Sequence, residues 1–112
     1  MSQQIVVFRA VIADASAIAT HQRMVDAMRD LATQIDGFVE WRDAMDGLTY
    51  WGHVMFESES AALAWNGDPR HEAIHDHGDL VYTEFSTHAF ASVRKASWRR
   101  SDRDDDDTAG GP

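Results

Sequence analysis

The first pattern along the chain is an apolar run from Ile5 to Ile12 that reads IVVFRAVI. β-branched residues dominate it and only Arg9 interrupts it, which is typical of a strand covered on both faces. Over residues 18–35, apolar positions recur at spacings of three, four and seven. This spacing predicts a helix of about 18 residues that packs on a sheet by one face, with Asp14 or Ser16 as its N-cap.

Turn-forming residues divide the middle of the chain. Asp36-Gly37 is expected to end the long helix, and Asp46-Gly47, a dipeptide favoured in tight turns, predicts a β-hairpin with its second strand over residues 49–56. Helix-start chemistry follows at residues 57–60, so a short second helix is expected through Trp65. Proline after it can open a further helical turn.

The last apolar stretch, Leu80 to Arg94, predicts a strand of about 15 residues, well beyond the usual length. Such a strand outruns its own small sheet, so its far half is expected to pair with the same strand of a second copy of the chain. The predicted order β-α-β-β-α-β is that of an α+β, ferredoxin-like sandwich. Residues 1–97 are expected to form this one domain, and residues 98–112 a disordered charged tail.

The composition restricts the partners. A formal net charge of -9 disfavours nucleic acid, because the basic residues between Arg94 and Arg103 are neutralised by neighbouring aspartates. The absence of cysteine rules out disulfides, thiolate nucleophiles and Cys-ligated metals, and a reducing cytoplasm fits best. Neither a signal peptide nor a membrane span is expected, because the first apolar run is short and has no basic segment before it.

Several segments together resemble the antibiotic biosynthesis monooxygenase family. They are VVFRAVI, the helix ending in IDGF, FESESAALAW, and PRHEAIHDHG followed by a long strand ending in ASVRK, all within residues 4–96. The resemblance implies a dimeric α/β barrel, in which two ferredoxin-like protomers press their sheets together. It also implies oxidation of aromatic, polyketide-like substrates by dioxygen without metal or flavin, although other members cyclise, isomerise or simply bind.

A second, narrower resemblance is to the heme-degrading monooxygenases of the same superfamily. Trp65 and His75 are ten residues apart, as are the tryptophan and the iron-ligating histidine of those enzymes, and His77 completes a similar H-x-H ending. This resemblance implies a heme with His75 as its axial ligand. The first-strand asparagine of those enzymes has Arg9 in its place, so the amide expected beside the iron-bound oxygen is missing.

The histidines after Pro69 allow several interpretations. His71 and His75 are four residues apart, so on a helix they share a face. They could contact a substrate or heme, or bind a divalent metal together with His77 or Glu72. Alternatively they are solvated groups at the negative end of a helix dipole.

Two further residues have both a structural and a functional interpretation. Trp65, on the apolar side of its helix, can be a core residue and also form the wall of a cleft for an aromatic ligand. Arg9 needs an anionic or carbonyl partner in an apolar strand. It can pair with Glu84 on the last strand, or face the cleft and stabilise an enolate formed from the substrate.

Cofactor-free oxygenation needs a base, a cationic stabiliser and a dry pocket. The sequence therefore predicts Arg9, His71 and His75 as catalytic residues. Predicted substrate-binding residues are Trp51, His53, Phe56, Trp65 and Tyr82, and His53 is also a possible base. The leading hypothesis is a homodimeric monooxygenase without a cofactor that acts on a hydrophobic aromatic or quinoid molecule. The alternatives are a heme protein that uses His75 and a non-catalytic ligand-binding dimer.

Overall fold

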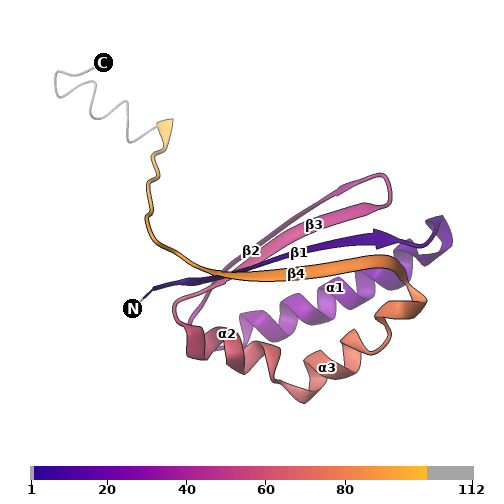
Figure 1. Cartoon of the computed structure of the whole chain (residues 1–112), viewed down its shortest axis with the longest axis horizontal. Helices are drawn as coiled ribbons and strands as arrows, with labels where there is room; N and C mark the ends of the chain where they lie inside the picture. Colours follow the sequence, from indigo (N-terminus) through magenta and orange to yellow (C-terminus); the bar gives the residue numbers. More distant parts are fainter. Residues whose placement is uncertain (1, 101–112) are drawn as a thin grey trace.

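The computed structural model describes residues 2–100, which form one antiparallel sheet with helices on one side (Figure 1). The elements in chain order are β1 (Gln4–Ile12), a 3-10 turn (Ala15–Ala17), α1 (Ile18–Thr33), β2 (Phe38–Asp46), β3 (Thr49–Phe56), α2 (Glu59–Asn66), α3 (Pro69–His75), a second 3-10 turn (Gly78–Leu80) and β4 (Tyr82–Ala91). The strand order across the sheet is β2-β3-β1-β4. The prediction of an α+β, ferredoxin-like fold is confirmed.

Local sequence accounts for most of these boundaries. Gly47 has φ +61° in the β2-β3 turn, a backbone conformation that glycine adopts without strain. The side chain of Ser58 caps α2 by accepting from the amide of Ala61, and Asp68 caps α3 by accepting from the amide of Arg70. Asp14 caps the first 3-10 turn rather than α1, which begins at Ile18.

The last strand is shorter than predicted. β4 has 10 residues and pairs along its whole length with β1, from Tyr82 opposite Ile12 to Ala91 opposite Gln4. It ends where its partner strand ends, while the predicted first residue, Leu80, belongs to the second 3-10 turn and Val81 follows that turn. The length of this strand therefore does not call for a second copy of the chain.

The core lies between the sheet and the helices. Phe8, Ala10 and Ile12 of β1 point into it, alternating with exposed or partly buried neighbours, and Val54 and Phe56 of β3 are fully buried. α1 and α2 add Leu31, Ala32, Ala61, Ala62 and Trp65 to the buried core. These contacts hold α2 beside the sheet, and Ile74 of α3 packs against the same core, which determines where the polar side chains of both helices lie.

The other face of the sheet carries no element of the described chain (Figure 1). Val7 of β1 is 38% exposed there, Trp51 of β3 42% and Phe90 of β4 55%. The expectation that β1 is covered on both faces is thus met on one face only within a single chain. No described helix is long and apolar enough to cross a membrane. The predicted tail falls largely on residues 101–112, outside the described residues.

Candidate functional site

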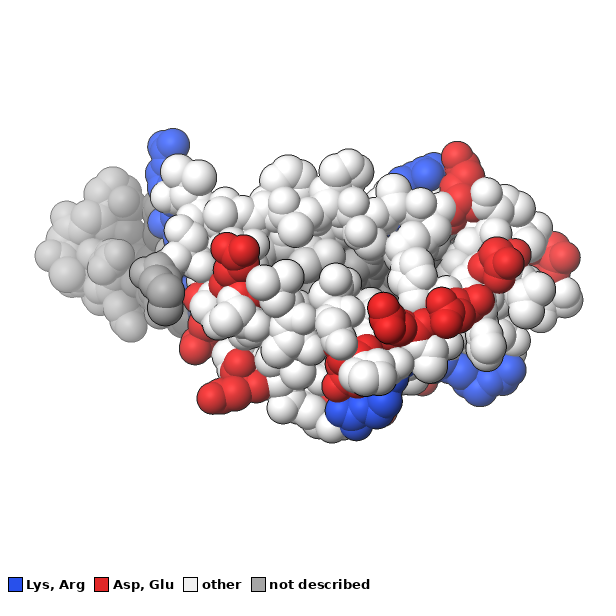
Figure 2. All heavy atoms as spheres, turned by 60° about the horizontal axis from the view of Figure 1, so that its bottom comes forward, with Lys and Arg blue, Asp and Glu red and all other residues white. Residues whose placement is uncertain are grey.

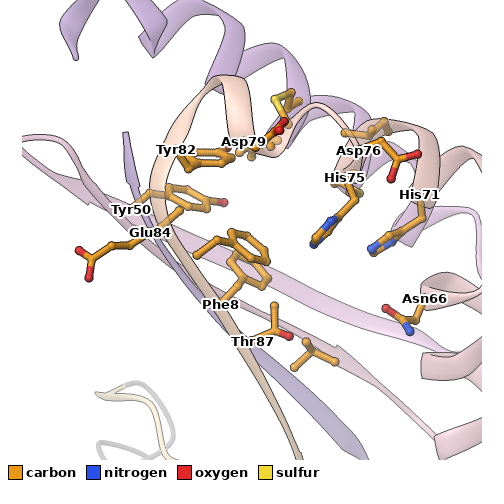
Figure 3. A pocket seen from close by; sticks show the side chains of 18 of the residues that line it. Phe8, Tyr50, Asn66, His71, His75, Asp76, Asp79, Tyr82, Glu84 and Thr87 are labelled. Carbon is orange, nitrogen blue, oxygen red and sulfur yellow. The ribbon is translucent and has the colours of Figure 1, made fainter. Parts of the chain in front are cut away.

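A cavity of about 420 Å³ lies between the helix-facing side of the sheet and helices α1, α2 and α3. Aromatic rings form much of its wall. One row of neighbouring rings consists of Tyr50, Phe8, Trp41, Trp65 and His71, and a second of Tyr82, Phe85 and His75. Figure 3 shows Tyr50 and Tyr82 on one side of the cavity and His71 and His75 on the other.

The tyrosine end is tied to a buried polar network. The hydroxyl of Tyr82 lies 2.7 Å from Nδ1 of His21, a residue of α1 that is only 2% exposed. The hydroxyl of Tyr50 donates to Oδ2 of Asp43 at 2.8 Å, and the indole N–H of Trp41 donates to the same oxygen at 3.1 Å. Both phenols are therefore held by partners behind the cavity wall.

Burial determines the charge state of these groups. It lowers the pKa of His21, against a smaller opposing effect of Asp43, so the imidazole stays neutral around pH 7. Burial also raises the pKa of Tyr82 to about 12 and that of Tyr50 further still, the latter with help from its bond to Asp43. Both tyrosines thus keep their protons near neutral pH.

The histidine end combines a buried and an exposed imidazole. His71 is 7% exposed, and its ring packs edge-on against that of Trp65, with the ring centroids 4.3 Å apart. Its Nδ1 is the only buried side-chain nitrogen or oxygen without a hydrogen-bond partner in residues 2–100. Burial, and then the proximity of His75, lowers the pKa of His71. A neutral, unpartnered imidazole beside an aromatic cavity can exchange a proton with a ligand.

The structure brings together four of the predicted site residues. Trp65, His71, His75 and Tyr82 all line the cavity. Trp65 combines the two roles expected of it: it is 4% exposed, donates its indole N–H to the carbonyl of Met28 at 3.2 Å, and forms part of the wall. His71 and His75 share a face of α3, with their rings stacked 6.3 Å apart.

Arg9 does not belong to this cavity, which corrects its predicted role as a cation beside the substrate. Strand alternation turns Phe8 and Ala10 toward the helices and Arg9 toward the opposite face. There its guanidinium lies 3.9 Å from Glu84, so the alternative of an ion pair is the one that agrees with the geometry. Figure 3 shows Glu84 pointing away from the cavity.

Three predicted substrate-binding residues also lie elsewhere. Trp51 is opposite Arg9 in the sheet register and shares the open face with it. His53 lies on that face too, with Nε2 2.7 Å from a carboxylate oxygen of Glu40, so it is not a base for this cavity. Phe56 faces the helices but is fully buried in the core and does not line the cavity.

The sequence interpretation missed Phe8, Tyr50, Phe85 and His21. The first three line the cavity, and His21 supports it from behind. Phe8 and Tyr50 alternate with residues of the other face, but both faces of β1 and β3 carry apolar side chains, so alternation alone does not identify the inner set. His21 contacts Tyr82 across 61 positions of sequence, and no local pattern indicates such a contact.

The cavity lining fits the predicted heme poorly. His75 is exposed at the cavity and could offer a ligand nitrogen, but the charged lining residues are all acidic. Asp76 and Asp79 lie beside the cavity, while Glu84 points away from it. Heme carries two propionates, which need cations or hydrogen-bond donors and are repelled by carboxylates. Within residues 2–100, no set of three or more His, Asp or Glu side chains is placed to hold a metal ion, including those around His71.

Comparison with known proteins shows the fold. No family model matches the sequence, and no curated protein matches it. Among solved structures, Rv0793 from Mycobacterium tuberculosis superposes with a TM-score of 0.75 at 18% identity, covering 86% of this chain and 100% of that one. SnoaB, a cofactor-independent oxygenase from Streptomyces nogalater, gives a TM-score of 0.72 at 13% identity, covering 86% and 97%.

A candidate antibiotic biosynthesis monooxygenase from Nitrosomonas europaea gives a TM-score of 0.72 at 7% identity, covering 86% of this chain and 95% of that one. The predicted resemblance to the antibiotic biosynthesis monooxygenase family is thus confirmed at the level of the fold. At these identities the residues that line the cavity are this chain's own, and its chemistry has to be argued from them.

Proposed function

We propose that this protein is a monooxygenase that works without a cofactor on a hydrophobic aromatic or quinoid molecule bound between the tyrosine and histidine ends of the cavity. The observation that carries the proposal is His71, a buried imidazole with an unpartnered Nδ1 on the wall of an aromatic cavity. Such an imidazole is a base without a competing partner, held where an aromatic ligand would lie.

The size and character of the cavity support this class of ligand. A volume of about 420 Å³ falls in the usual range for small-molecule sites, roughly 300 to 1,000 Å³. The two rows of rings offer flat surfaces and edges for a planar molecule. Phe85 connects the two ends, because its ring contacts both Tyr82 and His75.

The chemistry follows from the arrangement. His71 accepts a proton from an acidic hydroxyl or activated carbon of the substrate, and the resulting electron-rich anion transfers an electron to dioxygen beside a mainly apolar lining. Where an activated CH₂ becomes a carbonyl, one oxygen atom enters the product and the other leaves as water with the two hydrogens. The substrate itself supplies the electrons, so no reductant is required.

The comparisons add support of a general kind. SnoaB is named as a cofactor-independent oxygenase, and a protein of the same fold from Nitrosomonas europaea is a candidate antibiotic biosynthesis monooxygenase. The fold is therefore compatible with oxygen chemistry that needs no metal or flavin. The absence of Arg9 from the cavity leaves the side-chain amide of Asn66 and the hydroxyl of Thr87, which also line it, as donors for a developing anion.

The test is turnover of a panel of anthrones and hydroquinones, followed by product formation with and without dioxygen and by oxygen consumption in the aerobic reaction. We expect turnover only in the presence of oxygen, a loss of at least about 100-fold in His71→Gln, as general bases contribute on that scale, and a smaller loss in His75→Gln. Turnover that is unchanged in His71→Gln would refute the proposal. Binding of these compounds without any oxygen dependence would instead favour the non-catalytic alternative.

Hemin titration separates this proposal from the heme hypothesis. Because the charged lining is acidic, we expect no change in the Soret band that depends on His75. A Soret shift present in the wild type and absent in His75→Ala would establish axial ligation and overturn the choice of a cofactor-free enzyme.

We also propose that the protein is a homodimer joined through the open face of the sheet. This face exposes Trp51 and Phe90, and large exposed apolar patches mark interaction surfaces. It carries both signs of charge, with Arg9 near Glu84 and Arg42 near Glu40, so two copies related by a two-fold axis can be complementary to each other.

A further inference from the structure

The hydroxyl protons of Tyr50 and Tyr82, at one end of the cavity, are both used in hydrogen bonds to other side chains of the protein. Tyr50 donates to the carboxylate of Asp43, which can only accept. Tyr82 lies 2.7 Å from Nδ1 of His21, and we assign the proton of this neutral imidazole to Nε2, so that Nδ1 accepts from the phenol. Each phenol has one proton, so what remains of each hydroxyl is acceptor capacity.

We propose that this tyrosine end binds a hydrogen-bond donor of the ligand, a phenolic hydroxyl or an amine, through the oxygens of Tyr50 and Tyr82. The inference rests on the proposed cavity but names its substrate class: an aromatic molecule with a donor group at the end opposite His71. An aromatic ether or ketone, which can only accept, meets two acceptors there and leaves them unsatisfied.

The buried hydrogen bonds and ring contacts around the two tyrosines hold their hydroxyl groups in position. Asp43 accepts from the indole N–H of Trp41 as well as from Tyr50, so its carboxylate is held in position beside the phenol. The ring of His21 packs edge-on against two tyrosine rings. Its centroid is 4.5 Å from that of Tyr50 and 5.6 Å from that of Tyr82. Both hydroxyls are therefore oriented before a ligand enters, which lowers the cost of binding.

The charged residues that line the cavity favour the same class of ligand. Asp76 and Asp79 line the cavity, and no arginine or lysine does so among the described residues. Seen from the helix side, the molecule carries a row of acidic side chains across its surface (Figure 2). A ligand with a carboxylate is repelled, whereas a neutral phenol or a cationic amine is tolerated or attracted.

His71 lines the far end of the cavity, and its buried Nδ1 has no hydrogen-bond partner within residues 2–100. Figure 3 shows the tyrosine and histidine pairs on opposite sides with Phe8 between them. A planar molecule with polar groups at both ends, as in a hydroquinone, can satisfy both. A donor at one end only is sufficient for the tyrosine contact.

A matched series on one ring system tests the inference by calorimetry under nitrogen, where no oxidation can occur. The ligands are 2-naphthol, 2-methoxynaphthalene, 2-(aminomethyl)naphthalene and 2-naphthoate. We expect 2-naphthol to bind about 3- to 10-fold more tightly than its methyl ether, the value of one neutral hydrogen bond, and naphthoate to bind most weakly. The amine shows whether a cationic donor is preferred to a phenol.

Tyr82→Phe and Tyr50→Phe keep the rings and remove the oxygens, so each should reduce the preference for naphthol over its ether. His88→Gln, on β4 but directed to the open face opposite Val7, is the control and should leave it unchanged. Equal or tighter binding of the ether would overturn the inference, as would a preference that survives both tyrosine substitutions. Because binding is measured without turnover, this outcome is independent of whether oxygen is consumed in the test of the proposed function.

Discussion

The ring of Phe8 occupies the space that a side chain on Gly52 would need. These residues are opposite each other on β1 and β3, and a Cβ at position 52 would lie 2.2 Å from Cε2 of Phe8 and 3.0 Å from the carbonyl oxygen of Arg42. Glycine at this position therefore lets Phe8 lie flat against the sheet and form the floor of the cavity.

Gly52→Ala should displace the Phe8 ring and destabilise the protein by about 1 to 3 kcal/mol, the usual cost of overpacking a core. Urea denaturation measures it. Gly78→Ala is the matched control, because a Cβ there meets only a ring carbon of Tyr82 at an ordinary 3.7 Å. Replacing Phe8 with leucine in the Gly52→Ala background should recover part of the loss, and a cost for Gly52→Ala no larger than that for Gly78→Ala would contradict this account.

The fold was predictable because it depends on local signals. Apolar spacing located α1, and the dipeptide Asp46-Gly47 located the β2-β3 hairpin. The end of β4 was not predictable, because a strand ends where its partner β1 ends, and that register depends on the whole sheet.

The site was predictable mainly on its helical side, and Tyr82 is the one predicted strand residue that lines the cavity. Trp65, His71 and His75 follow from helix spacing, and all three line the cavity. On the strands, Arg9 and Trp51 were assigned to the wrong face, because a strand that is apolar on both faces gives no indication of which face the helices cover. Which face of each strand the helices cover is determined only by the packing of the helices on the assembled sheet.

The contact between His21 and Tyr82 should stabilise the fold as well as orient the phenol. It joins α1 to β4 at 2.7 Å in a largely buried position. A double-mutant cycle of His21→Phe and Tyr82→Phe should give a coupling of about 1 kcal/mol in the free energy of unfolding, the value of a buried hydrogen bond. Thr83→Val, which removes an exposed 3.5 Å contact to the carbonyl of Val11, should cost less, and a coupling near zero would show that the two groups act independently.

Stability should fall on mild acidification because two histidines are buried. Burial lowers the pKa of His21 and of His71 in the folded state, while the unfolded chain protonates them near their ordinary value of about 6.5. Below that pH the unfolded state binds more protons, so the free energy of unfolding decreases as pH falls and is fully restored above about pH 7. Urea titrations between about pH 5 and 7 should show this slope, and His71→Gln should make it shallower. An unchanged slope in that variant would show that His71 titrates equally in both states.

Trp51 is the residue through which the proposed dimer is most directly tested. It is 42% exposed in the single chain, on the face opposite the helices, and lies across the sheet from Arg9. In the dimer its ring would be buried, so Trp51→Glu should place an unpaired carboxylate in an apolar contact and shift the protein toward a monomer. Sedimentation velocity over a range of concentrations measures the change.

Leu63→Glu is the control for that experiment, because Leu63 is 59% exposed on α2, away from the open face. It should leave the sedimentation coefficient unchanged. A wild-type protein that sediments as a monomer at all concentrations would remove the proposed dimer. A dimer that persists in Trp51→Glu would instead place the interface on another surface, such as the outer edge of β4, whose backbone donors and acceptors face no other strand of the described sheet.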